Sequence, residues 1–126
     1  MNQKSLSHLE QQVMDIVWRR KECSVREAVE ELRKTRKIAY TTVATIFRRL
    51  VTKGLLTMQE KYFAYIYSPK MSKESYSKKI ANTFIKTFVH SFGDIAIASF
   101  AKSIDSLPKT KRAYFLKLLE AHDTTK

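Results

Sequence analysis

The hydrophobic pattern of the chain changes period at Gly54, and this change most constrains its fold. Before Gly54, apolar residues recur three and four positions apart in three successive segments, the spacing of amphipathic helices. After it, Leu55 to Met58 and Phe63 to Ser68 have the character of strands, and the polar Gln59-Glu60-Lys61 joins them. Three helices followed by a β-hairpin describe a winged helix-turn-helix.

The first two helical segments both begin with a capping signal. Ser7-His8-Leu9-Glu10 and Ser24-Val25-Arg26-Glu27 have the S-x-x-E form, in which both side chains accept hydrogen bonds from backbone N–H groups at a helix start. We therefore expect a helix to begin directly after each serine. The third helix is expected from about Tyr40 to Lys53, because Gly54 is a favourable residue just beyond a helix C-terminus.

The rest of the chain has a helical pattern. With two glycines and two prolines in 126 residues, few tight turns are possible, which favours long helices. The pattern restarts near Ser72, is broken at Gly93-Asp94, and begins a last segment at Ser106-Leu107-Pro108. The fold class expected is therefore mainly α with a small β-hairpin: a winged-helix domain over residues 1–70 and a helical region over residues 71–126.

An apolar stripe runs through this helical region. Three amphipathic helices in about 55 residues do not form a well-filled core on their own. We interpret the region as a dimerisation element that makes the protein a homodimer, and an independent second domain is the alternative. The residues assigned to the dimer contact are Tyr76, Ile80, Phe84, Phe88, Phe92, Phe100, Phe115, Leu118 and Leu119.

The charge balance indicates a polyanionic partner. Lys and Arg number 24 against 12 Asp and Glu, giving a net charge of +12, which suits nucleic acid most often and sometimes an anionic membrane. The single cysteine, Cys23, excludes an intrachain disulfide framework, and we expect no metal and no cofactor. Because the chain lacks a Gly-rich phosphate loop and a glycine-framed serine, we expect no enzyme activity and no small-molecule substrate.

The third helix carries the candidate DNA contacts. In "IAYTTVATIFRRL", short hydroxyl residues and arginines lie opposite the apolar Val43, Ile46, Phe47 and Leu50. Hydroxyl groups reach phosphates or base edges, and arginine pairs with phosphate or guanine. A solvated face on a basic helix is the alternative. Lys61 is expected at the hairpin tip as a phosphate contact, or simply as a solubilising turn residue. The candidate residues are Tyr40, Thr41, Thr42, Thr45, Arg48, Arg49 and Lys61.

Four motifs together resemble the BlaI/MecI/CopY family of bacterial transcriptional repressors. They are "LSHLEQQVMDIVW", "SVREAVEEL", "AYTTVATIFRRLVTKGLL" and "AYIYSPKMSKESY", in register from Leu6 to about Tyr76. The resemblance implies a winged-helix DNA-binding domain and a helical C-terminal dimerisation region. It also implies a homodimer that occupies a palindromic operator on double-stranded DNA and blocks transcription of resistance or homeostasis genes.

The resemblance also assigns roles to individual residues. Thr41, Thr42, Thr45 and Arg49 occupy the family's recognition-helix positions. In the penicillinase-repressor branch, a membrane sensor's signal leads to cleavage before a phenylalanine in the dimerisation region. The bond that resembles this site is Ser99-Phe100, in "IAIASFAKS", and the alternative role of Phe100 is that of a core residue.

Two features depart from the family pattern. The copper-responsive branch has a C-terminal CxC…CxC site, which this chain lacks, so copper sensing through thiolates is excluded. The family wing usually reads "EGR", whereas this one reads Lys61-Tyr62-Phe63, without the turn glycine and the arginine.

We therefore expect a homodimeric repressor that binds an inverted-repeat operator and is relieved by proteolysis in the dimerisation region. A protein-interaction module and a nonspecific architectural DNA binder are the competing readings. The segment Met1-Asn2-Gln3-Lys4 leads into no apolar stretch typical of a signal peptide, so we expect a cytoplasmic protein.

Overall fold

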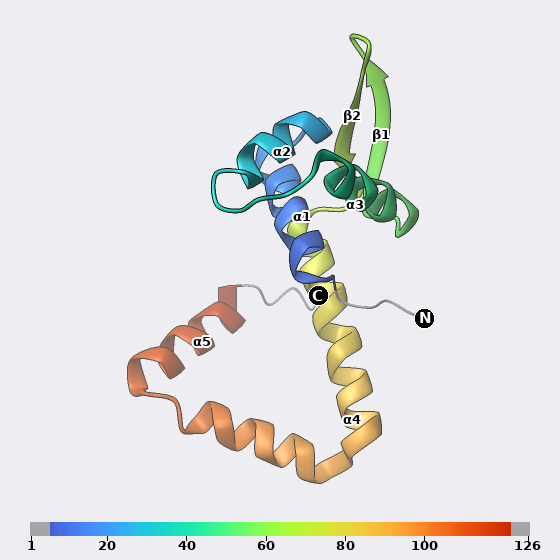
Figure 1. Ribbon diagram of the computed structural model, residues 1–126. Coiled ribbons are helices and arrows are strands. Elements are labelled where there is room, and N and C mark those ends of the chain that lie inside the picture. The colour runs from blue at the N-terminus through green and yellow to red at the C-terminus, as the bar shows by residue number, and fades with distance from the viewer. Residues whose placement is uncertain (1–5, 122–126) are drawn as a thin grey trace. The chain divides into compact units, whose positions relative to one another are not determined.

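A computed structural model describes residues 6–121, so the segment Met1-Asn2-Gln3-Lys4 lies outside the described residues. The protein is mainly helical with one two-stranded antiparallel sheet, as the sequence predicts (Figure 1). No helix within the described part is long and apolar enough to cross a membrane. The elements in chain order are α1 (His8–Arg20), α2 (Val25–Leu32), α3 (Tyr40–Thr52), β1 (Leu56–Lys61), β2 (Ala64–Pro69), α4 (Lys73–Asp105) and α5 (Lys109–Ala121).

Both predicted capping boxes are formed, which fixes where α1 and α2 begin. The Ser7 N–H donates to Glu10 Oε1 at 3.0 Å, and the Glu10 N–H donates to Ser7 Oγ at 3.2 Å. Ser24 and Glu27 make the same reciprocal pair, at 2.9 and 3.1 Å. Each box satisfies backbone N–H groups that have no partner inside the helix.

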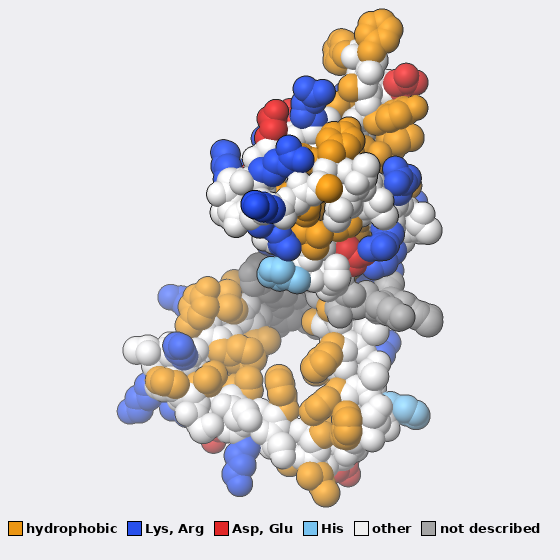
Figure 2. Space-filling model, viewed as in Figure 1, with side chains coloured by type: hydrophobic (Ala, Val, Ile, Leu, Met, Phe, Trp, Pro, Cys, Tyr) orange, Lys and Arg blue, Asp and Glu red, His pale blue; other side chains and the backbone are white. Residues whose placement is uncertain are grey.

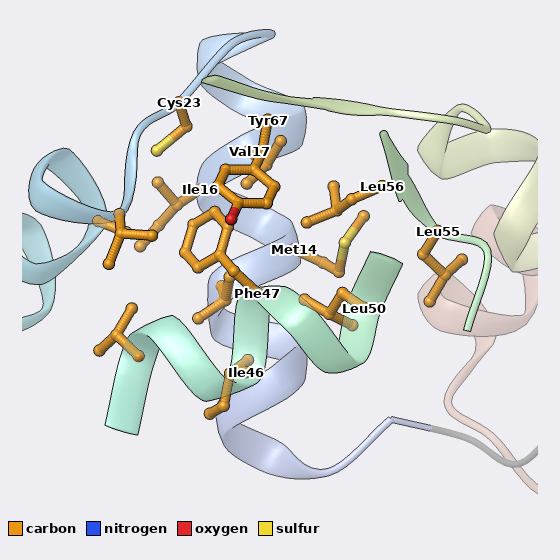
Figure 3. Close-up of a cluster of buried hydrophobic side chains, with 14 of the residues drawn as sticks. Met14, Ile16, Val17, Cys23, Ile46, Phe47, Leu50, Leu55, Leu56 and Tyr67 are labelled. Carbon is orange, nitrogen blue, oxygen red and sulfur yellow. The ribbon is translucent and has the colours of Figure 1, made fainter. Parts of the chain in front are cut away.

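The hydrophobic core lies between the first three helices and the hairpin (Figure 3). Phe47 of α3 is fully buried, and its ring centroid lies 4.6 Å from that of Tyr67 on β2 in an edge-on arrangement. Met14 of α1 and Leu50 of α3 are buried beside them. This packing fixes the hairpin against α3, and the hydrogen bond from the Leu55 N–H to the Leu50 carbonyl at 2.9 Å continues the connection.

A buried carboxylate is paired with an exposed lysine at the edge of this core. Glu10 is only 3% exposed, and Lys53 Nζ donates to its two carboxylate oxygens at 2.9 and 3.1 Å. Burial opposes ionisation of this carboxyl group, but the hydrogen bonds from Lys53 and Ser7 outweigh it, so the pKa of Glu10 is lowered. The pair joins the first turn of α1 to the C-terminal cap of α3.

The hairpin turns about two residues later than the sequence predicts. β1 continues through Gln59-Glu60-Lys61, with Lys61 paired to Ala64, so the turn is Tyr62-Phe63. Polar residues are common in turns, which is why this run predicts one, but here they form an exposed strand. A third short strand contact joins Cys23 to Tyr67 by two backbone hydrogen bonds, of 2.9 and 2.8 Å. Burial raises the pKa of the Cys23 thiol to about 11.

The first compact unit extends to Ala81, beyond the predicted boundary at residue 70. Tyr76 belongs to its core, which corrects its assignment to the dimer contact. Tyr76 is 8% exposed and its ring centroid lies 5.8 Å from that of Trp18, whose indole N–H donates to the Met71 carbonyl at 3.0 Å. Ile80 is partly buried against the same core. The reason is that the start of α4 covers the end of α1, which the periodicity of α4 alone does not reveal.

The second unit, residues 82–126, contains the rest of α4 and all of α5. Gly93 has φ 72° and ψ −157°, which no helix tolerates, and the predicted break at Gly93-Asp94 is confirmed. Phe84 and Phe88 stack with ring centroids 5.8 Å apart, yet no residue described between 82 and 121 is buried. Figure 2 shows many apolar side chains exposed in this part of the chain.

Candidate nucleic-acid interface

The two faces of α3 differ as the sequence predicts. Val43, Ile46, Phe47 and Leu50 are buried. On the opposite face, Thr41, Thr42, Arg48 and Arg49 are exposed, Tyr40 is half exposed, and Ala44 and Thr45 are half-buried. The apolar face anchors α3 to α1 and the hairpin, so the polar face is held rigidly at the surface.

Thr45 has a structural function within this polar face. Its hydroxyl donates to the Thr41 carbonyl at 2.9 Å, one turn earlier, and accepts a hydrogen bond from Arg48 Nη2 at 3.3 Å. The first bond is the common way in which a threonine is accommodated inside a helix. The second orients the Arg48 guanidinium along the helix. The side chains of Thr41 and Thr42 make no such bond to any described residue, so their hydroxyls are available for a ligand.

The positive charge of Arg48 on α3 acts on Tyr67 of β2. Burial raises the pKa of the Tyr67 phenol, and Arg48 opposes this rise through its positive charge. Tyr40 and Tyr65 raise the pKa of this phenol further.

The N-terminus of α3 differs from those of α1 and α2. Its N-cap is Ala39, which makes no side-chain cap hydrogen bond, and its first turn contains no acidic residue. The backbone N–H groups at this end are thus not occupied by a serine and a glutamate, as they are in α1 and α2. A helix start of this kind favours an anion such as a phosphate group.

Lys61 is placed differently from the prediction. It is the last residue of β1 rather than the hairpin tip, and its Nζ lies 2.9 Å from Glu22 Oε2. Two hydrophobic residues, Tyr62 and Phe63, form the tip instead, and both have positive φ angles. The structure therefore separates Lys61 from the tip and pairs its charge with a carboxylate.

The loop between α2 and α3, over residues 33–37, is a further basic segment beside α3 that was not among the predicted site residues. Arg33 Nε donates to the Ile38 carbonyl at 3.0 Å, and Arg36 Nη1 donates to Gln12 Oε1 at 2.7 Å. Both hydrogen bonds hold the loop that leads into α3. All five residues from 33 to 37 are exposed, and Lys34 and Lys37 add further positive charge. The signal was present as a basic, non-periodic run directly before the third helix. Figure 2 shows Lys and Arg side chains distributed over this unit.

Comparison with known proteins gives matches that cover from about half to nearly all of the chain. At 24% identity, a penicillinase repressor of Bacillus licheniformis aligns over 121 residues, covering 96% of this chain and 94% of the relative. A penicillinase repressor of Staphylococcus aureus is 28% identical over 80% of both chains. The transcriptional regulator BlaI of Mycobacterium tuberculosis is 42% identical over 65 residues, 51% of this chain and 47% of the relative.

Two solved structures share the fold of the first unit. One is the solution structure of the monomeric form of Bacillus licheniformis BlaI in complex with the blaP half-operator. It has a TM-score of 0.50 and 27% identity, and the match covers 58% of this chain and 89% of that chain. The other is the DNA-binding domain of the repressor BlaI, with a TM-score of 0.52, 27% identity, and coverage of 60% and 94%.

These likenesses agree with the four motifs of the sequence and with the winged-helix arrangement of α1 to β2. The model of the penicillinase repressor family matches residues 6–121, which is nearly the whole sequence. The chain belongs to the penicillinase repressor family, a family of transcriptional repressors rather than enzymes.

Proposed function

We propose that the protein is a sequence-specific DNA-binding repressor that acts as a homodimer on an inverted-repeat operator. The exposed face of α3 carries this proposal, because hydroxyl groups, arginines and an uncapped helix start are presented together on a rigidly anchored helix. The related BlaI of Bacillus licheniformis, in complex with the blaP half-operator, supports the same use of this domain. By this relationship the regulated genes include antibiotic resistance genes, and the protein acts in the cytoplasm.

In this account α3 enters the major groove of double-stranded DNA. Thr41 and Thr42 contact phosphates or base edges near the helix start, and Arg49 contacts the phosphate backbone. Thr45 positions Arg48, which reaches a phosphate or a guanine. Tyr40 lies at the entrance of the helix, and the exposed loop over residues 33–37 adds positive charge beside it. Because these contacts release counterions from DNA, the affinity for DNA falls steeply as the salt concentration rises.

The exposed apolar residues of the second unit support a homodimer. Phe84 is 60% exposed and Phe92 is 67% exposed, and Leu118 and Leu119 of α5 are exposed as well. An apolar surface of this extent is unusual on a monomer and is typical of an interface. Burial against a second copy would cover it and would place two α3 helices on two half-sites related by a two-fold axis. Phe88, Phe100 and Phe115 are assigned to the same contact.

Proteolysis between Ser99 and Phe100 is the proposed route to relief of repression, after a signal from a membrane sensor. Both residues are exposed, and the Ser99 carbonyl accepts a hydrogen bond from Ser103 Oγ at 3.0 Å within α4. A protease needs an extended chain, so α4 must unwind locally before it is cut. Fragments from derepressed cells are expected to begin at Phe100 on N-terminal sequencing. Derepression with the chain intact would contradict this route.

Selection of bound sequences from a random duplex library at physiological salt tests the proposed function. Enrichment of an inverted repeat is the expected result. Enrichment without a consensus would indicate a nonspecific architectural DNA binder, and no enrichment would indicate a protein-interaction module. Either of these two outcomes would overturn the proposal.

A further inference from the structure

Two aromatic side chains at the tip of the wing are almost fully exposed in the described part of the protein. Tyr62 is 92% exposed and Phe63 is 102% exposed, and together they form the two-residue turn between Lys61 and Ala64. Figure 1 shows the hairpin extending away from the three helices of the first unit. Burial therefore does not explain why this turn contains large apolar residues.

Turn geometry does not explain them either. Tyr62 has φ 53° and Phe63 has φ 65°, so both central residues adopt the left-handed conformation of a type I′ turn. Asn-Gly is the favoured sequence there, because bulky side chains are strained at positive φ. The wing thus keeps an aromatic pair at the position where the backbone disfavours it most, and such outliers concentrate at functional sites.

The length of the wing can be compared with the spacing of the grooves of DNA. Tyr67 is the outermost buried residue of β2, and it packs on Phe47 of α3. Phe63 lies four positions before Tyr67, so the tip extends about 13 Å beyond the core at 3.3 Å per residue. Adjacent major and minor grooves are about half a helical turn apart, roughly 17 Å. A wing of this length, fixed beside a recognition helix, reaches the minor groove next to the half-site.

The chemistry of the tip suits insertion rather than charge pairing. The nearest cation, Lys61, is paired with Glu22, and the tip itself is uncharged. Apolar side chains such as phenylalanine enter the minor groove by wedging between base steps and unstacking them. A protein partner is less suitable, because a specific interface buries about 800 Å² on each side, far more than two side chains present.

We propose that Tyr62 and Phe63 form an apolar wedge that enters the minor groove beside each half-site. This inference rests on the proposed binding of α3 in the major groove. Phe63 inserts between two base pairs, and the Tyr62 ring packs on the neighbouring sugar. Since pyrimidine–purine steps unstack most easily, the wing favours such a step at this position and extends the recognised sequence beyond the α3 contacts.

The test compares the unchanged protein with Tyr62→Asn/Phe63→Gly, a variant with the favoured sequence of the same turn. Its hairpin is expected to be at least as stable, which thermal unfolding checks, while affinity for the selected duplex falls about tenfold through lost contacts to the bases. Phe63→Leu is the matched control, because leucine also serves as a wedge, and it is expected to bind within about twofold of the unchanged protein.

Fluorescence of 2-aminopurine, placed at the base step half a turn from the half-site, reports unstacking directly. The unchanged protein is expected to increase the fluorescence and the Asn-Gly variant is expected not to. The proposal of a wedge is wrong if the Asn-Gly variant binds as tightly as the unchanged protein and neither protein changes the fluorescence. The proposed function of α3 is not affected by that result. If the unchanged protein binds no duplex at all, the proposed function fails as well.

Discussion

At the scale of single residues, the hydroxyls of α3 divide into two groups. Thr45 bonds to the Thr41 carbonyl and holds Arg48, so its hydroxyl is already used inside the protein. Thr41 and Thr42 are exposed near the uncapped helix start, where a phosphate is favoured. A helix rich in threonine is thus explained by two functions, one within the protein and one toward DNA.

Arg49 is the residue whose removal tests the phosphate contacts of α3. Arg49→Ala is expected to weaken binding to the selected duplex and to reduce the slope of log affinity against log salt by about one unit, because one fewer counterion is released. Fluorescence anisotropy over a salt series measures both. Lys117→Ala, which removes an exposed charge of α5, is the control and should leave half-site recognition intact. An unchanged slope and affinity for Arg49→Ala would exclude this contact.

The Glu10–Lys53 pair makes stability depend on pH. Lys53→Met leaves the Glu10 carboxylate buried without its cation, and the free energy of unfolding at neutral pH is expected to fall by about 2 kcal/mol, less than for a fully buried pair because Lys53 reaches solvent. The folded pKa of Glu10 is lowered from 4.5, so this stabilisation is present above about pH 4.5 and is lost as the pH falls through the folded value.

Urea unfolding between neutral pH and pH 3 measures this effect. The difference between the unchanged protein and Lys53→Met is expected to shrink as the pH falls. Lys70→Met, which removes an exposed lysine whose side chain makes no ion pair with described residues, should change little. If the difference in free energy of unfolding stays constant with pH, the Glu10–Lys53 pair is not the source of the pH dependence.

At the scale of elements, the sequence patterns correctly predicted the features that depend on neighbouring residues in the chain. The capping boxes after Ser7 and Ser24, the two faces of α3 and the break at Gly93 all follow from short-range rules, and all are confirmed. The burial of Tyr76 and the turn at Tyr62-Phe63 were missed. Tyr76 is buried by Trp18, which is distant in sequence, and the turn contradicts the usual residue preferences.

The bend at Gly93 gives a prediction at this scale. Its φ and ψ lie in a region that is essentially restricted to glycine, so Gly93→Ala strains the bend or forces α4 to straighten. If residues 82–126 form the dimer contact, self-association is expected to weaken by roughly tenfold, which corresponds to about 1.4 kcal/mol. Sedimentation equilibrium measures the dissociation constant of the dimer. Ser91→Ala, at an exposed position in the same helix, is the control. Equal weakening in both variants would show that self-association does not depend on the bend at Gly93.

At the scale of the whole molecule, the chain combines a self-sufficient core with a region that lacks one. Residues 6–81 bury a continuous cluster that extends from Val13 of α1 to Tyr76 of α4, whereas no described residue beyond 81 is buried. The first compact unit ends at Ala81, whereas the sequence pattern divides the chain at residue 70, because the start of α4 has the same periodicity as the rest of the helix. A DNA-binding fragment should therefore end at Ala81, not at Lys70.

The number of chains bound to one duplex tests the central claim most directly. Sedimentation velocity with the selected duplex is expected to give two full-length chains per inverted repeat, bound cooperatively. The fragment of residues 1–81 is expected to be monomeric in solution and to bind each half-site independently and weakly. One full-length chain per inverted repeat, or a stable dimer of the fragment alone, would contradict the account.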